Sequence, residues 1–156
     1  MTGSNLSDEA SVHIEAPAEK IYEIVTDVAG MGRLSPECTG GRWIDGATGP
    51  AVGARFKGTN KRGIARWSTT NTVVAAEPGK EFAFETKDSG YRWRYRIEAE
   101  GTGAVVTESR EEFAERPLLA RVFTKLLLGG VDGHDDELRA GIVATLDRLK
   151  TLAEAG

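Results

Sequence analysis

The 156-residue sequence lacks three features that would restrict its class at once: paired cysteines, a long apolar run and an excess of positive charge. Its one cysteine, Cys38, has no partner for an internal disulfide, so we expect a protein of the reducing cytoplasm. No apolar run approaches the roughly 20 residues that span a bilayer, and residues 1–10 do not have the basic-then-apolar order of a signal peptide. The net charge of −4 argues against nucleic acid or an anionic membrane as the partner.

Residues for metal and nucleophilic chemistry are scarce as well. The only histidines are His13 and His134, and no group of His, Cys and carboxylate residues has metal-ligand spacing, so we predict no metal and no cofactor. His134 lies in an acidic helix start, where a solvated helix cap is favoured over a proton shuttle at a cavity mouth. Ser109 has no nucleophile-elbow motif around it, and no phosphate-binding glycine loop occurs.

Strand patterns fill the sequence between residues 53 and 113. The clearest runs from residue 91 to residue 97, where aromatic and apolar residues alternate with arginines at the period of two that is typical of a strand. Turn sequences bound it on both sides, Asp88-Ser89-Gly90 before it and Gly101-Thr102-Gly103 after it. Helical spacing occurs from Pro17 to Leu34 and again from Asp132 to the C-terminal end.

The order of these elements predicts one α+β domain over residues 11–154, preceded by a flexible lead-in, residues 1–10. A strand around Val12 and Ile14 comes first, two short helices follow, and six further strands precede a long C-terminal helix. We therefore expect a curved antiparallel sheet of about seven strands that wraps around the terminal helix and leaves room for an internal cavity.

Four segments of the sequence resemble those of a known family. They are Ser35-Pro36-Glu37-Cys38 leading to Gly41-Arg42-Trp43, Arg66-Trp67-Ser68-Thr69, Glu77-Pro78-Gly79 with Phe82-Ala83-Phe84, and Thr145-Leu146-Asp147-Arg148-Leu149-Lys150. With the element order, they resemble polyketide cyclase/dehydrase-like proteins of the SRPBCC (START-like) superfamily over residues 11–154. The resemblance implies the helix-grip fold and a hydrophobic ligand such as a lipid, an isoprenoid or a polyketide. It supplies no catalytic motif that can be transferred.

Aromatic residues on the predicted strands are the main candidates for a cavity wall. Large rings bring apolar area with defined geometry, and Trp and Tyr add a polar tip that can orient a ligand. The alternative is plain packing against the terminal helix; we expect a core with a cavity-lining subset, led by Tyr91, Trp93 and Tyr95. With two residues of the terminal helix, the predicted ligand-binding set is Trp43, Phe56, Trp67, Phe84, Tyr91, Trp93, Tyr95, Phe113, Leu138 and Ile142.

Glu111 and Asn71 are catalytic candidates besides His134. If Glu111 faced the cavity, desolvation would raise its pKa and suit it to act as a general acid or base in cyclisation or dehydration. A shifted register, which we favour because unpaired buried carboxylates are rare, leaves Glu111 in solvent and turns Glu108 or Arg110 inward. Asn71, on the face of Trp67, is predicted either to hydrogen-bond a ligand carbonyl or to be an edge residue.

Two further segments leave alternatives open. Five basic residues between positions 55 and 66 have no acidic residue among them, which predicts either an anion-binding patch or a solvated outer face that prevents edge-to-edge pairing. The apolar segment 118–128 is expected either to move as a lid or to form a dimer surface, so monomer and homodimer both stay open.

Three functions are consistent with these features. The favoured one is binding or carrying a hydrophobic small molecule, because the aromatic face has no convincing catalytic set beside it. A polyketide cyclase or dehydratase would use polar groups in the same cavity. A stress-response module would bind a partner protein through the apolar segment 118–128.

Overall fold

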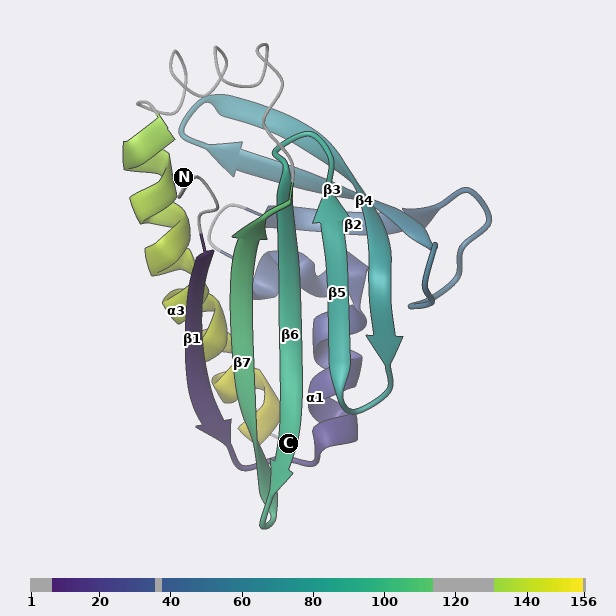
Figure 1. Cartoon of the computed structure of the whole chain (residues 1–156), viewed down its shortest axis with the longest axis vertical. Helices are drawn as coiled ribbons and strands as arrows, with labels where there is room; N and C mark the ends of the chain where they lie inside the picture. The colour runs from purple at the N-terminus through teal and green to yellow at the C-terminus, as the bar shows by residue number, and fades with distance from the viewer. Residues whose placement is uncertain (1–6, 36–37, 114–130, 156) are drawn as a thin grey trace.

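Seven strands build one antiparallel sheet, in the order β1-β7-β6-β5-β4-β3-β2. The computed structural model describes residues 7–35, 38–113 and 131–155, and the side chains of all these except Ser7 and residues 131–139. From β2 to β7 each strand lies beside the next, and β1 joins the sheet next to β7 (Figure 1). The strands are β1 (Ser7–Ile14), β2 (Cys38–Ile44), β3 (Arg55–Arg62), β4 (Ala65–Glu77), β5 (Glu81–Thr86), β6 (Tyr91–Glu100) and β7 (Gly103–Glu112).

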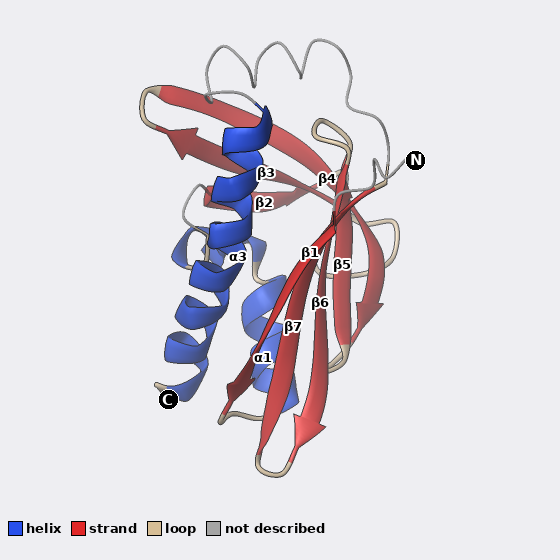
Figure 2. Cartoon of the chain, turned by 60° about the vertical axis from the view of Figure 1, so that its left-hand side comes forward, coloured by secondary structure: helices blue, strands red, loops and turns tan. Residues whose placement is uncertain are grey.

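Helices cover one side of this sheet. Helix α1 (Ala18–Thr26) and a 3-10 helix, η1 (Val28–Arg33), follow β1, and the long helix α3 (Val131–Glu154) comes after the strands. Figure 2 shows α1 and α3 on the same side of the sheet, with the strands curved around them. The helix-grip prediction is therefore confirmed, including two short helices after the first strand. In the described part of the chain, no helix is long and apolar enough to cross a membrane.

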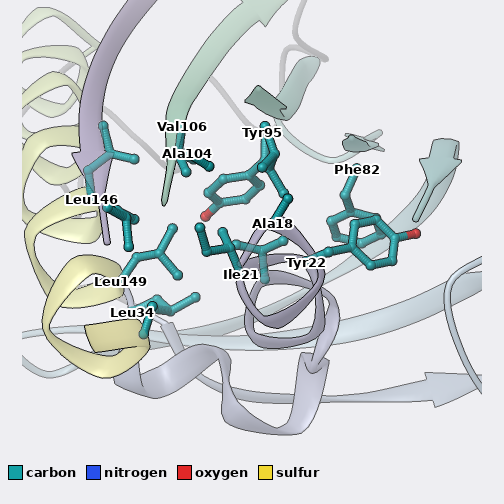
Figure 3. Packing of buried hydrophobic residues seen from close by; sticks show 14 of the residues in the cluster. Ala18, Ile21, Tyr22, Leu34, Phe82, Tyr95, Ala104, Val106, Leu146 and Leu149 are labelled. Atoms are coloured by element: carbon teal, nitrogen blue, oxygen red, sulfur yellow. The ribbon is translucent and has the colours of Figure 1, made fainter. Parts of the chain in front are cut away.

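The core lies between the sheet and α3. Four buried residues of α3, Ile142, Leu146, Leu149 and Ala153, recur at helical spacing and form one apolar stripe. Figure 3 shows Leu146 and Leu149 of this stripe near Val106 of β7, with the apolar side chains of α1 beside them. Fully burying one such large side chain contributes about 1.5–3 kcal/mol, so the stripe is enough to hold the helix on the sheet.

The N-terminal boundary differs from the prediction. Strand β1 begins at Ser7, and residues 7–10 pair with β7, so the expected lead-in over residues 1–10 is wrong for its last four positions. The sequence pattern is obscured there because the strand carries charged residues at its start: the carboxylate of Asp8 pairs with the guanidinium of Arg110 inside the protein.

A ladder of ion pairs covers the convex face of β5, β6 and β7. Arg92 binds Glu85 at 2.6 Å and Glu111 at 3.0 Å, and Arg94 pairs with Glu81 and, at 3.9 Å, with Glu111. Cross-strand pairs of opposite charge contribute roughly 0.2–1 kcal/mol each. These arginines alternate with aromatic residues along β6, so the ladder fixes which side of that strand faces the helices.

Gly41 allows η1 to pack directly on the sheet. A Cβ atom at this position would lie 2.8 Å from the carbonyl oxygen of Lys57 and 2.9 Å from that of Val28. Both are backbone atoms, on β3 and on η1, so neither can rotate away. Because η1 supplies part of the cavity floor, Gly41 also holds that floor in place.

We predict that Gly41→Ala destabilises the protein by about 1–3 kcal/mol, the usual cost of forcing a methyl group into packed backbone. Urea unfolding followed by circular dichroism measures the change. Gly49→Ala is the matched control, because a Cβ atom there meets nothing within 4 Å. Equal stabilities of the two variants would contradict the packing argument.

Candidate functional site

A cavity of about 730 Å³ lies between the concave face of the sheet and the helices. Its walls come from β3, β4, β5 and β6, its floor from the segment around η1, and one side from α3. Apart from Glu108 and two basic residues at the β3–β4 turn, the lining residues that the structure describes are uncharged. The lining residues used below are Phe56, Trp67, Asn71, Phe84, Tyr91, Trp93, Tyr95, Glu108 and Ile142.

Most of the predicted aromatic residues lie in this wall. Phe56 and Phe84 pack edge to face with ring centroids 5.0 Å apart, and Tyr91 and Trp93 do so at 6.2 Å. Trp43 is not among the lining residues and instead packs behind Phe56, at 5.5 Å. Edge-to-face pairs add about 0.5–1.5 kcal/mol beyond area burial, so the rings form a defined wall.

Phe113 also lies away from the cavity. Its ring lies under the guanidinium of Arg92, 5.7 Å from the ring centroid, and Arg92 belongs to the convex ladder. Ile142 of α3 does line the cavity, whereas the side chain of Leu138 lies outside the described residues. The structure thus brings seven of the ten predicted ligand-binding residues to one cavity; their ligand-binding role stays a prediction.

The amide of Asn71 is engaged within the sheet. Its Nδ2 donates to the carbonyl oxygen of Phe56 and to Oγ1 of Thr69, both at 3.3 Å, and its Oδ1 accepts from Oγ1 of Thr86 at 2.6 Å. Asn71 and Thr86 are both buried. The network ties β3, β4 and β5 together, so Asn71 serves the wall of the cavity and has no donor hydrogen left for a ligand.

Glu108 is the acidic side chain that faces the cavity. It is only 4% exposed, it comes from β7, and its Oε1 has no hydrogen-bond partner among the described residues. Burial raises the pKa of this carboxyl to about 8, while a hydrogen bond donated by Tyr95 lowers it by a smaller amount. At neutral pH the carboxyl is therefore mostly protonated, and it can donate as well as accept a hydrogen bond.

Tyr95 and Cys38 line the cavity together with Glu108. Burial, and then the neighbouring charges of Glu108 and Cys38, raise the pKa of Tyr95 well above its ordinary value. Burial also raises the pKa of the Cys38 thiol, which donates to the carbonyl oxygen of Gly40 at 3.5 Å. Cys38 is thus a protonated, half-buried thiol and not an activated nucleophile.

Glu111 does not face the cavity, which excludes it as a catalytic group there and agrees with the shifted register favoured from the sequence. Its side chain is 40% exposed and pairs with Arg92 on the convex face. A three-residue turn over Gly101-Thr102-Gly103 would have turned Glu111 inward, but Glu100 pairs with Gly103, so the loop has only two residues. This register sets Glu108 opposite Tyr95 and makes the shifted alternative correct.

Arg110 also faces inward, two residues beyond Glu108. Its side chain is fully buried, it pairs with Asp8 of β1, and its guanidinium lies 4.5 Å from the ring centroid of Tyr91. A buried cation needs a counter-charge, and its N–H groups need acceptors. The Asp8 carboxylate supplies the counter-charge, and the face of the Tyr91 ring supplies a further favourable contact. Arg110 therefore clamps β1 to β7 at the end of the aromatic wall.

The remaining candidates do not join the cavity in the described structure. His13 is half-exposed and lies 3.3 Å from Glu15 and 3.6 Å from Glu100 at the far end of β1. The side chain of His134 and the whole segment 118–128 lie outside the described residues. Among the residues that are described, no cluster of three or more His, Cys, Asp or Glu side chains could hold a metal ion.

Comparison with known proteins agrees with the fold. The model of the family described as "Polyketide cyclase / dehydrase and lipid transport" matches residues 7–154. A polyketide-cyclase-like protein from Corynebacterium glutamicum, solved in solution, is 32% identical with a TM-score of 0.66; the match covers 99% of this chain and 94% of that one. No curated protein matches the chain.

Two more distant structures share the fold alone. The di-domain ARO/CYC BexL, from the BE-7585A biosynthetic pathway, is 19% identical with a TM-score of 0.69, and the match covers 97% of this chain and 51% of that one. Ara h 8.0201 is 11% identical with a TM-score of 0.70, and the match covers 98% of this chain and 100% of that one.

We predict that stability falls as the pH rises because of Glu108. Its folded pKa lies above its unfolded value, so its contribution is present in acid and is lost as the carboxyl ionises up to about pH 8. The loss between about pH 5 and about pH 8 amounts to roughly 3 kcal/mol. Urea unfolding across this range measures it, and Glu108→Gln should flatten the profile. An unchanged slope in that variant would show that Glu108 ionises normally.

Proposed function

We propose a function for this chain, which belongs to the family of polyketide cyclases, dehydrases and lipid transport proteins. The chain binds a hydrophobic small molecule that carries one neutral polar group. The observation that carries the proposal is Glu108, a buried carboxyl with an unpartnered oxygen in an otherwise mostly apolar cavity. An unsatisfied buried polar atom costs roughly 1–3 kcal/mol, and a ligand that pairs with it removes this cost.

The cavity wall suits a flat or ringed apolar ligand. The cavity volume of about 730 Å³ lies within the usual range for small-molecule sites. Phe56, Phe84, Tyr91 and Trp93 present ring faces and edges to this space. Such rings stack on apolar skeletons at little cost in side-chain entropy, which supports a lipid, isoprenoid or polyketide as the class of ligand.

The protonation state of Glu108 limits which polar groups the ligand can carry. A neutral carboxyl donates to a carbonyl or hydroxyl oxygen without placing a charge in the cavity. A ligand carboxylate would need a counter-charge, and the buried guanidinium nearest in sequence, that of Arg110, is already paired with Asp8. We therefore expect ketones, enols and alcohols to be preferred over acids.

Cyclisation or dehydration is the second candidate function, and the raised pKa of Glu108 is the observation that favours it. A carboxyl with a pKa near neutral pH can both give and take a proton. In the dehydration of a β-hydroxy ketone, the carboxylate form of Glu108 would remove the proton on the carbon beside the ketone. The carboxyl thus formed would return that proton to the hydroxyl as the C–O bond breaks and the C=C bond forms, so that an enone and water are the products and the carboxylate is regenerated.

Binding can be tested with two ligands that differ only in a carbonyl, fluorenone and fluorene. Each is titrated against the fluorescent probe N-phenylnaphthylamine, which reports occupancy of the cavity. We predict that fluorenone competes about two- to tenfold better in the native protein, the usual worth of one net hydrogen bond. In Glu108→Leu the preference should vanish. Failure of the probe to bind, or equal competition in the native protein, would overturn the proposal.

The catalytic candidate needs a readout that binding alone does not change. A phenyl-substituted β-hydroxy ketone becomes a conjugated enone on dehydration, and the product absorbs in the near ultraviolet. Glu108→Gln keeps a hydrogen-bond donor but cannot transfer a proton, so we predict binding within a fewfold of native and at least a hundredfold slower conversion. Conversion at equal rates in both proteins would exclude Glu108 as the acid.

A further inference from the structure

The outer face of β2, β3 and β4 brings four basic side chains together. The pairing register sets Arg42 opposite Lys57 and Lys61 opposite Arg66. Directly opposed residues of antiparallel strands share a side of the sheet, and like charges in such positions destabilise it. Arg42, Lys61 and Arg66 are exposed, and Lys57 is half-buried. These four residues are called the basic face below.

Nearby acidic side chains are already engaged elsewhere. Asp45 pairs with Arg55 at 2.6 Å, Glu85 belongs to the convex ladder, and Asp88 accepts from the backbone N–H of Thr70 at 3.1 Å. The sequence has no acidic residue from position 46 to position 76. Within the described structure, the four residues of the basic face form no ion pair, so an external anion would relieve their mutual repulsion.

An exposed apolar side chain lies at the edge of the basic face. Ile64, in the β3–β4 turn, is 99% exposed, and a Cβ atom on the neighbouring Gly63 would meet nothing within 4 Å. One exposed isoleucine is ordinary on a protein surface. Its position is what matters here, because Lys61 and Arg66 flank it on the two strands of the hairpin.

We propose that the basic face and Ile64 dock on an anionic lipid bilayer. Each basic side chain near an anionic membrane surface strengthens binding about fivefold, and an apolar tip that enters the acyl boundary adds to this attraction. Nucleic acid fits less well, because unspecific binding to single strands uses exposed aromatic rings, and Trp67 beside this hairpin lines the cavity instead. The net charge of −4 opposes binding of an anionic membrane by the rest of the surface, so the attraction would be confined to the basic face and would orient the protein on the membrane.

Docking in this way would bring the cavity mouth to the lipid. Arg62, Gly63 and Trp67 belong to the cavity lining and to the same hairpin as Ile64. A ligand could then pass between bilayer and cavity without crossing water. This consequence rests on the proposed ligand binding, whereas the docking itself does not.

Vesicle sedimentation tests the docking without any cavity ligand. Native protein should sediment with vesicles of phosphatidylcholine and phosphatidylglycerol but not with phosphatidylcholine alone, and added salt should weaken the binding. Ile64→Ser should lower the partition constant about tenfold, the effect of withdrawing one large apolar side chain. The double variant Lys61→Glu/Arg66→Glu should lower it by more than about twentyfold, from two lost attractions and two new repulsions.

Matched control variants distinguish binding through the basic face from a general effect of surface hydrophobicity or net charge. Val52→Ser removes another exposed apolar side chain, and Lys80→Glu/Arg96→Glu changes the net charge equally at exposed sites away from the basic face. Both controls should bind vesicles within about twofold of native, and circular dichroism checks that all variants fold. The proposal is overturned if the basic-face variants bind as the native protein does, if the controls lose as much, or if native protein binds duplex or single-stranded DNA and not vesicles.

Discussion

The strict alternation of side chains across β5, β6 and β7 is the constraint on which the rest of the structure depends. A slip of one residue would exchange the two faces of a strand. The ion pairs of Arg92 and Arg94 on the convex face oppose such a slip, since each binds carboxylates on both neighbouring strands. By holding the arginines outward, the ladder holds Trp93 and Tyr95 toward the helices, and the cavity wall follows from it.

The same constraint explains why one carboxyl in the cavity differs from all its neighbours. The glutamates of the ladder have arginine partners and partial contact with solvent, so their negative charge is compensated. Within the described structure, Glu108 is buried without a cationic partner, and its charged form is disfavoured. The cavity therefore offers a bound molecule a neutral carboxyl as a polar contact.

Much of the fold could be predicted from the sequence, because its signals are local. The alternation around Tyr91 and Tyr95, the turn residues and the stripe on α3 each specify an element without knowledge of its neighbours. The site needed one non-local fact, the loop length between β6 and β7. Val105 and Val106 are both apolar, so the pattern of β7 does not show which parity faces inward. A two-residue turn, closed by Glu100 and Gly103, would have pointed to Glu108, and only the pairing register distinguishes it from a longer turn.

Alternation also lets one hairpin serve two surfaces. Along β3, Phe56, Gly58 and Asn60 line the cavity, and Lys57 between them points to the opposite side. Lys61, at the end of the strand, borders both the cavity and the basic face. Residues that line the cavity and residues that would meet a membrane are thus neighbours in sequence, held in fixed relation by the same backbone hydrogen bonds. The two surfaces therefore share the same two strands, and a substitution in this hairpin can affect both of them.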